Sequence, residues 1–187
     1  MNGRLPRRLT ISTSILLLLV SLLAPIARAA NWPTGALVAW DFDIARNNTV
    51  LDQTFTIREL RSYVISLRFK YEDRPDLHRV LSLLGDNSLE HPGYPIPLRL
   101  QVVKVSDGDM EVLVDRLIET MKIFVHAFNP PDGQSGAFGR EIYTINLGPG
   151  QYRLVASTVQ DSPEFVGTPC QLAVEGYANL RFVPQAK

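Results

Sequence analysis

The chain has 187 residues, with 19 basic and 19 acidic side chains that give a formal net charge of zero, and a single cysteine. This length is enough for one domain with a substantial core, and one cysteine cannot form an internal disulfide, so packing must stabilise the fold. The basic residues form no cluster after the N-terminal region, which argues against nucleic acid or an anionic membrane as a partner.

The first 29 residues have the layout of a secretory signal peptide. Arg4, Arg7 and Arg8 precede an apolar run over residues 15–26, and the small residues of Ala27-Arg28-Ala29 follow it. A retained membrane anchor is the alternative, but several hydroxyl side chains dilute the apolar run. We therefore expect residues 1–29 to be removed, the protein to be periplasmic or secreted, and no stable membrane anchor to remain.

Removal of residues 1–29 would leave 158 residues and change the charge balance. Four arginines and no acidic residues lie in the leader, so 15 basic and 19 acidic residues remain, a net charge near −4. We expect an N-terminal arm over residues 30–37, a single domain over residues 38–183 and a tail over residues 184–187. No cysteine lies near the cleavage site, so we expect no lipid there.

Alternation of apolar and polar residues predicts β-strands along most of the chain. In the clearest strand, residues 62–71, one face carries Tyr63, Ile65, Leu67, Phe69 and Tyr71. The other face includes Ser66 and Arg68, which we expect in water. Weaker runs predict further strands at residues 37–42, 50–57, 97–105, 112–118, 123–128, 141–147, 151–159 and 171–174. Turn-rich joints separate them, so the sequence predicts an all-β fold, an antiparallel Ig-like or Greek-key β-sandwich of about eight or nine strands.

One short helix is expected over about residues 75–84. Its apolar residues recur at helical spacing and form one stripe: Leu77, Val80, Leu81 and Leu84. Pro75 suits the first turn of a helix, and Gly85 is placed to end it. We expect this helix to close one end of the sandwich.

Residues 147–152, with the sequence Leu-Gly-Pro-Gly-Gln-Tyr, are the most specific structural signal in the chain. They are similar to the tyrosine corner of Greek-key sandwiches, in which a phenol hydroxyl bonds to backbone across a turn. We expect Leu147, Pro149, Gly150 and Tyr152 to form such a corner, which would stabilise the fold without forming a ligand site.

No residue set in the sequence defines a catalytic or cofactor site. The three histidines, His78, His91 and His126, have no partner at a spacing typical of metal ligands. A Gly-x-Ser-x-Gly elbow and a phosphate-binding glycine loop are absent. We therefore expect no enzyme, no cofactor and no metal.

Two further groups have alternative interpretations. Cys170 lies in a strand-like segment with no histidine after it, which predicts a buried, inert thiol; a reactive surface thiol is the alternative. Asp41 and Asp43 flank Phe42 and would point the same way from a strand. They could bind calcium or cleave a glycoside, but acids on the solvent face of a strand are more common.

Residues 129–138 form the candidate recognition loop, because they exceed what a hairpin requires. The loop carries Pro130, Pro131 and Gln134, with the aromatic Phe138 at its tip. Long loops on rigid sandwiches are frequent recognition elements, and a disordered loop is the alternative.

Several segments occur in the order found in a known family: residues 96–100, Val114-Asp115, His126, Arg140-Glu141-Ile142, residues 147–154 and residues 163–169. Over residues 38–176 the chain resembles the bacterial envelope proteins of domain of unknown function 5625. The resemblance implies a small exported β-sandwich without defined functional residues. Members of such families are often lipoproteins, and this chain differs because the leader lacks the required cysteine.

Export, small size, mild acidity and the lack of catalytic motifs favour a non-catalytic module that binds another protein in the cell envelope. One version is an immunity protein against a toxin delivered into the periplasm. A carbohydrate-binding or envelope accessory domain is the alternative, with Trp32, Tyr94 and Tyr177 as available aromatic residues. A divergent hydrolase that uses Asp41 and Asp43 is a third, weaker hypothesis.

Overall fold

The computed structural model describes residues 36–85, 92–119, 125–128 and 135–176. These residues belong to one structural unit that spans residues 33–187. The predicted signal peptide, nearly all of the predicted arm and the tail lie outside the described residues, so these three remain predictions. Among the helices that the described residues form, none has the length and apolar character needed to cross a bilayer.

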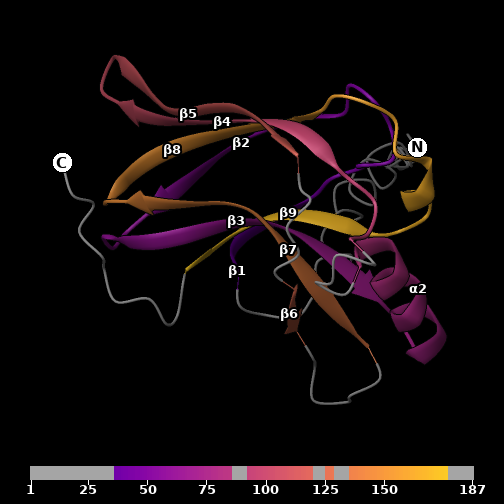
Figure 1. Cartoon of the computed structure of the whole chain (residues 1–187). Helices are drawn as coiled ribbons and strands as arrows, with labels where there is room; N and C mark the ends of the chain where they lie inside the picture. Colours follow the sequence, from indigo (N-terminus) through magenta and orange to yellow (C-terminus); the bar gives the residue numbers. More distant parts are fainter. Residues whose placement is uncertain (1–35, 86–91, 120–124, 129–134, 177–187) are drawn as a thin grey trace, which may run out of the picture. The chain divides into compact units, whose positions relative to one another are not determined.

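Nine strands form two antiparallel sheets among the described residues (Figure 1). The five-stranded sheet has the order β1 (Ala36–Asp41), β9 (Cys170–Gly176), β3 (Arg61–Tyr71), β7 (Gly136–Leu147) and β6 (Val125–Phe128). The four-stranded sheet has the order β2 (Val50–Ile57), β8 (Gly150–Thr158), β4 (Pro97–Ser106) and β5 (Asp109–Glu119). One α-helix, α2 (Arg74–Leu84), and a short 3₁₀ helix, η2 (Pro163–Phe165), complete the described elements. The predicted all-β sandwich with one short helix is confirmed.

Each predicted strand coincides with an observed one, and the differences lie at the strand ends. β5 begins at Asp109 rather than residue 112, because Gly108, with a φ of 89°, closes a tight hairpin with β4. β7 begins at Gly136 rather than residue 141, because it pairs with β3 as far as Tyr71. The start of the predicted strand at residues 123–128 lies outside the described residues.

Two connections between the sheets lie side by side at one end of the sandwich. One joins β2 to β3 and the other joins β7 to β8, so each passes from one sheet to the other. Because β2 pairs with β8 and β3 pairs with β7, Ile57 lies opposite Gly150 and Arg61 lies opposite Leu147. The two connections therefore set the relative position of the sheets at this end.

A tyrosine closes each of these connections. The Tyr152 hydroxyl donates to the carbonyl of Gly148 at 2.8 Å, which is the contact expected of a tyrosine corner. The Tyr63 hydroxyl donates to the carbonyl of Glu59 at 2.9 Å, so the neighbouring connection has the same design. Burial raises the pKa of the Tyr152 hydroxyl, which keeps the proton that it donates. The Tyr152 ring also stacks on Phe55, with ring centroids 5.7 Å apart.

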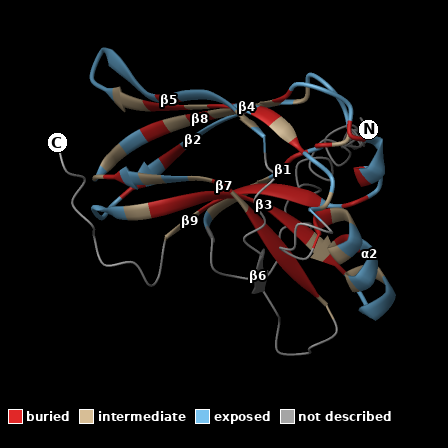
Figure 2. Ribbon diagram, viewed as in Figure 1, coloured by how far each residue is buried: buried red, intermediate tan, exposed pale blue. Residues whose placement is uncertain are grey.

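The central strand β3 is buried on both faces (Figure 2). Its inner face packs in the core as predicted. Ser66 and Arg68 on the outer face are only 3% and 1% exposed, so the prediction that they face water is wrong. The Arg68 Nε lies 3.1 Å from Glu175 Oε1, which also accepts a hydrogen bond from Ser66 at 2.7 Å. Glu175 of β9 therefore offsets part of the cost of burying the Arg68 charge and accepts the hydrogen bond of the Ser66 hydroxyl.

The ends of helix α2 follow from its sequence. The Asp73 carboxylate accepts a hydrogen bond from the Asp76 backbone N–H at 2.8 Å, and Pro75 occupies the first turn. Gly85 ends the helix with a φ of 82°, and its N–H donates to Leu81 at 2.8 Å. This positive φ is readily adopted only by glycine, which explains its place at the helix end.

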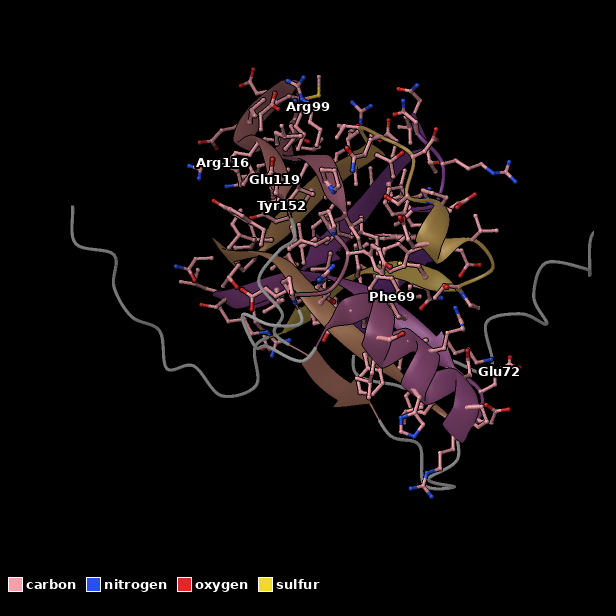
Figure 3. All side chains as sticks on the ribbon, turned by 45° about the vertical axis from the view of Figure 1, so that its right-hand side comes forward. Phe69, Glu72, Arg99, Arg116, Glu119 and Tyr152 are labelled. Carbon is pink, nitrogen blue, oxygen red and sulfur yellow. The ribbon has the colours of Figure 1, made fainter. Side chains whose placement is uncertain are left out.

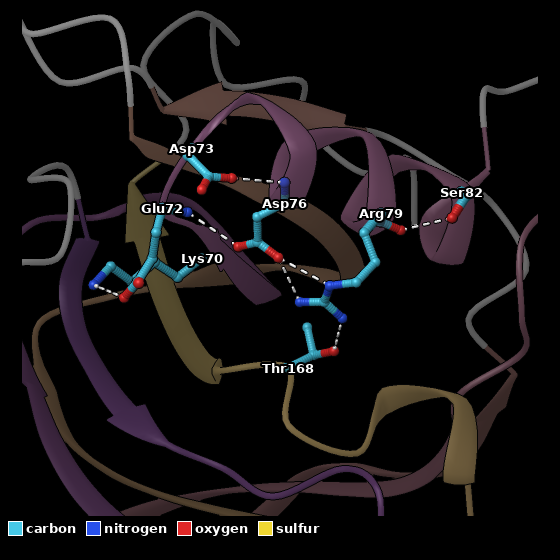
Figure 4. A network of polar contacts seen from close by, with 7 residues as sticks. All are labelled: Lys70, Glu72, Asp73, Asp76, Arg79, Ser82 and Thr168. Carbon is cyan, nitrogen blue, oxygen red and sulfur yellow. Dashed lines mark hydrogen bonds and ion pairs between the residues drawn. The ribbon is translucent and has the colours of Figure 1, made fainter.

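Helix α2 is attached to the rest of the sandwich by apolar and polar contacts (Figure 4). Val80 and Leu84 are fully buried. Arg79 donates to the Asp76 carboxylate at 2.7 and 2.9 Å and to the Thr168 hydroxyl at 2.8 Å. The Arg79 contacts tie the first half of the helix to the segment between η2 and β9.

Arg140 of β7 holds the other end of the helix. It pairs with Leu67 of β3, which places it on the inner face of the sheet, and it is fully buried. Its guanidinium donates to the carbonyls of Tyr94 at 2.8 Å, Leu84 at 3.0 Å and Pro92 at 3.4 Å. Burial lowers the pKa of Arg140 to about 10, so the group is still charged at neutral pH. A cation at the C-terminus of a helix also interacts favourably with the helix dipole.

Replacing Tyr152 with Phe should lower the free energy of unfolding by about 1 kcal/mol, because the part-buried hydrogen bond to the Gly148 carbonyl is lost. Tyr63→Phe should have a similar effect. Tyr94→Phe is the matched control, since the Tyr94 side chain is 44% exposed and should tolerate the change. Urea denaturation followed by circular dichroism measures the three values. A Tyr152→Phe protein as stable as wild type would contradict the prediction.

The variant Arg140→Met should lose about 3 kcal/mol of stability, because the carbonyls of Leu84, Pro92 and Tyr94 lose their donor inside the protein. Arg153→Met is the control, because Arg153 forms an ion pair with Asp52 at the surface, where solvent screening leaves such a pair little effect on stability. The same denaturation experiment compares the two variants. Equal losses of stability in the two variants would show that the hydrogen bonds of Arg140 contribute no more than an exposed ion pair.

Candidate binding surface

The candidate recognition loop is only partly within the described residues. Pro130, Pro131 and Gln134 lie outside them. Phe138 does not form a loop tip: it belongs to β7, is 7% exposed, and stacks on Tyr71 with ring centroids 5.1 Å apart. The prediction for Phe138 is therefore wrong, because the pairing of β7 with the full length of β3 draws this residue into the core.

Asp41 and Asp43 each bond to neighbouring residues. Asp41 accepts a hydrogen bond from the Gln171 carboxamide at 3.1 Å. Asp43 accepts one from the Ala45 backbone N–H at 3.0 Å and lies 3.4 Å from the Arg46 guanidinium. These contacts give the two carboxylates local roles at the end of β1.

The described residues bring together no group of three or more His, Cys, Asp and Glu side chains that could hold a metal ion. His78 is exposed on α2, and His126 pairs through its backbone with Gly139. His91 lies outside the described residues. Cys170 is buried at the start of β9, and burial raises the pKa of its thiol well above the usual range.

The most distinctive surface of the described structure is the edge of the four-stranded sheet, formed by β5. This strand of 11 residues pairs with β4 at ten of them and has no second partner among the described strands. The other sheet edges are shorter: β1 has 6 residues, β6 has 4 and β2 has 8. Figure 2 shows β5 largely in the colour of exposed residues. A long edge strand presents backbone N–H and C=O groups that another strand can bind.

Apolar side chains are exposed along this edge. Met110, Val112 and Leu117 are each more than half exposed. In the β4–β5 register these three residues lie opposite Val105, Val103 and Arg99, respectively. They therefore form an exposed apolar row on one face of the hairpin, interrupted between Val112 and Leu117 by the register shift at Val102/Val103 and by the charged Asp115.

The charge of β5 is predominantly negative. The strand carries four acidic residues and one basic residue, a formal charge of −3: Asp109, Glu111, Asp115, Glu119 and Arg116. Asp115 is paired with Arg99, whose guanidinium donates at 3.0 and 3.2 Å and holds the pKa of Asp115 below its usual value. Arg116 lies over the ring of Tyr143, 6.0 Å from its centroid. Figure 3 shows Arg99, Arg116 and Glu119 in the same part of the molecule, away from Phe69 and Glu72.

A shallow pocket of about 340 Å³ adjoins the C-terminal end of β5. Its lining residues are Pro95, Pro97, Leu117, Glu119, Val159 and Gln160. Leu117 and Val159 are exposed aliphatic side chains, while Glu119 provides a carboxylate and Gln160 a carboxamide. The pocket has the chemistry to accept an aliphatic side chain next to a basic or amide group. We refer to β5 and this pocket as the β5 edge site.

Sequence reasoning predicted most of the β5 strand but not its place at the edge of a sheet. The order of strands depends on long-range pairing, which periodicity does not report. One signal was available: five of its 11 residues are charged, and edge strands are commonly protected by charged side chains.

These features define a class of small two-sheet β-sandwich proteins with one long exposed edge strand. The family model described as "Domain of unknown function (DUF5625)" matches residues 39–176, and the chain belongs to this family. The resemblance predicted from the sequence is therefore confirmed.

The same fold is found in the crystal structure of a protein from Sulfurospirillum deleyianum, with a TM-score of 0.61 and 18% identity over 76% of this chain and 98% of that chain. A family GH115 4-O-methyl-α-glucuronidase with specificity for decorated arabinogalactans is more distant, with a TM-score of 0.37 and 12% identity. That match covers 76% of this chain and 18% of the glucuronidase, and it carries no functional argument. No curated protein matches the chain in sequence.

The burial of Cys170 predicts how its thiol reacts. In the native protein, a water-soluble disulfide reagent should modify Cys170 far more slowly than in the same protein unfolded in urea, because the thiol is buried and protonated. Absorbance of the released thiolate measures both rates. Equal rates would indicate an accessible thiol and would contradict the prediction.

Proposed function

We propose that this protein is an exported, non-catalytic binding module whose ligand is another protein of the cell envelope. The observation that carries the proposal is the exposed apolar row on a long edge strand, formed by Met110, Val112 and Leu117. Exposed apolar side chains grouped on one surface and bordered by charged residues are typical of protein interaction sites.

The pocket chemistry favours a protein ligand over a carbohydrate. Sugar rings commonly bind on exposed aromatic side chains, and the six residues that line the pocket include none. Its walls are aliphatic, from Leu117 and Val159, and suit the side chains of a polypeptide. Tyr94 is partly exposed, and its backbone binds Leu83 and Arg140, which gives this residue a structural role.

The envelope location and the immunity hypothesis rest on the sequence. The arginines, apolar run and small residues of the leader support export. A protein of this size and mild acidity, without a catalytic motif, is suited to neutralise a toxin by occupying its surface. If a toxin gene lies beside the gene for this protein, the product of that toxin gene is therefore the first partner to test.

The site is tested by capture of a partner from an envelope extract with wild-type protein and two variants. Leu117→Glu should reduce recovery of the specific partner by at least about tenfold, since removal of an apolar anchor residue from an interface typically costs about 2 kcal/mol or more and the carboxylate adds a desolvation cost. Val50→Glu is the matched control, because Val50 lies on the opposite edge strand of the same sheet and is 63% exposed, compared with 64% for Leu117.

Mass spectrometry with labelled reference proteins quantifies the captured partner. Recovery that falls only with Leu117→Glu would support the β5 edge site. Equal recovery with both variants would show that binding uses another surface. Capture of no specific protein, including the product of a neighbouring toxin gene, would count against the protein-binding function itself.

A further inference from the structure

The β5 edge site restricts the form of the partner that it can bind. About half of the residues in an edge strand direct their N–H and C=O groups away from the sheet. Along 11 residues this edge is about 35 Å long, at roughly 3.4 Å per residue. A surface of this shape matches an extended segment that adds to the sheet as one more strand.

The charge of the strand restricts the partner further. β5 has a formal charge of −3, and the pocket at its end contains the carboxylate of Glu119. A second copy of this chain would bring another strand of charge −3 against it, which is unfavourable at short range. A cationic segment has the complementary charge.

From these observations we propose that β5 binds an extended cationic segment of a partner protein as a fifth strand of the four-stranded sheet. An aliphatic side chain of that segment would enter the pocket between Leu117 and Val159, and a lysine or arginine would pair with Glu119. This inference rests on the proposed protein-binding function and specifies the chemistry of its ligand.

Specificity in such a complex would be divided between backbone and side chains. Backbone hydrogen bonds to β5 can form with a segment of any sequence in the extended conformation. Selectivity would come from alternate side chains of the added strand, which face Met110, Val112 and Leu117. Asp115 is already paired with Arg99, so Glu119 is the carboxylate placed to select a basic residue.

The probe is a short synthetic peptide with the repeat Val-Thr-Lys-Thr, called the lysine–valine peptide, because it places valine and lysine two residues apart on one face, as Leu117 and Glu119 are on β5. Hydrogen exchange of the backbone amides, measured by mass spectrometry, should slow in β5 when the peptide is added and should not change in β2, the other edge of the sheet. The same peptide with glutamate in place of each lysine, the glutamate peptide, should give no protection. The lysine peptide with alternate amides N-methylated should also give none, because it cannot complete the strand hydrogen bonds.

Two charge variants test the role of the carboxylate. Glu119→Lys should weaken binding of the lysine–valine peptide by roughly tenfold at low salt, with a smaller effect as salt rises. Glu164→Lys on η2 is the control, because it makes the same charge change at an exposed residue outside the β5 edge site. Fluorescence anisotropy of the labelled peptide measures both affinities.

Protection confined to β5, together with a selective effect of Glu119→Lys, would support strand addition by a cationic segment. Protection by the glutamate peptide or by the N-methylated peptide would overturn it, as would a dimer in size-exclusion chromatography with β5 protected in the absence of peptide. If Leu117→Glu abolishes partner capture while the lysine–valine peptide leaves β5 unprotected, the protein-binding function stands and strand addition fails.

Discussion

The single cysteine of the chain, Cys170, lies buried in β9 of the five-stranded sheet and cannot form a disulfide to the other sheet, so packing and the chain connections must hold the two sheets together. The central strand β3 meets this requirement on both faces, with an apolar inner face and Arg68 next to Glu175 on the outer face. At one end, the hydroxyls of Tyr63 and Tyr152 close the two connections that pass between the sheets. Arg140 joins the inner face of β7 to the end of α2. The rest of the fold is positioned by these contacts.

The same arrangement leaves β5 with one partner strand, β4, among the described residues. The edges β1 and β6 are short, and β2 is shorter than β5. Edge strands usually avoid association by being short, charged or bulged, and β5 has charge and one bulge in its pairing with β4. The charge of β5 is predominantly negative, so it discourages self-association, and under our proposal it would also attract a cationic ligand. Protection against aggregation and selection of a partner would then have the same physical basis.

The sequence predicted the fold well because the signals involved are local. Alternation located the strands, helical spacing and Gly85 located α2, and the turn before Tyr152 identified a tyrosine corner. Three errors or omissions involve long-range pairing. Phe138 joined the core because β7 pairs with all of β3, Arg68 is buried beside Glu175 of the distant strand β9, and the exposure of β5 followed from the strand order.

By itself, the sequence determined the class of fold, the family and the approximate positions of the strands and the helix, since these depend on neighbouring residues along the chain. Only the tertiary structure decided which charged residues are buried, which aromatic residue belongs to the core and which strand lies at an edge. These outcomes depend on partners far away in sequence. The candidate binding surface belongs to this second group, because an edge exists only after all the other strands have paired.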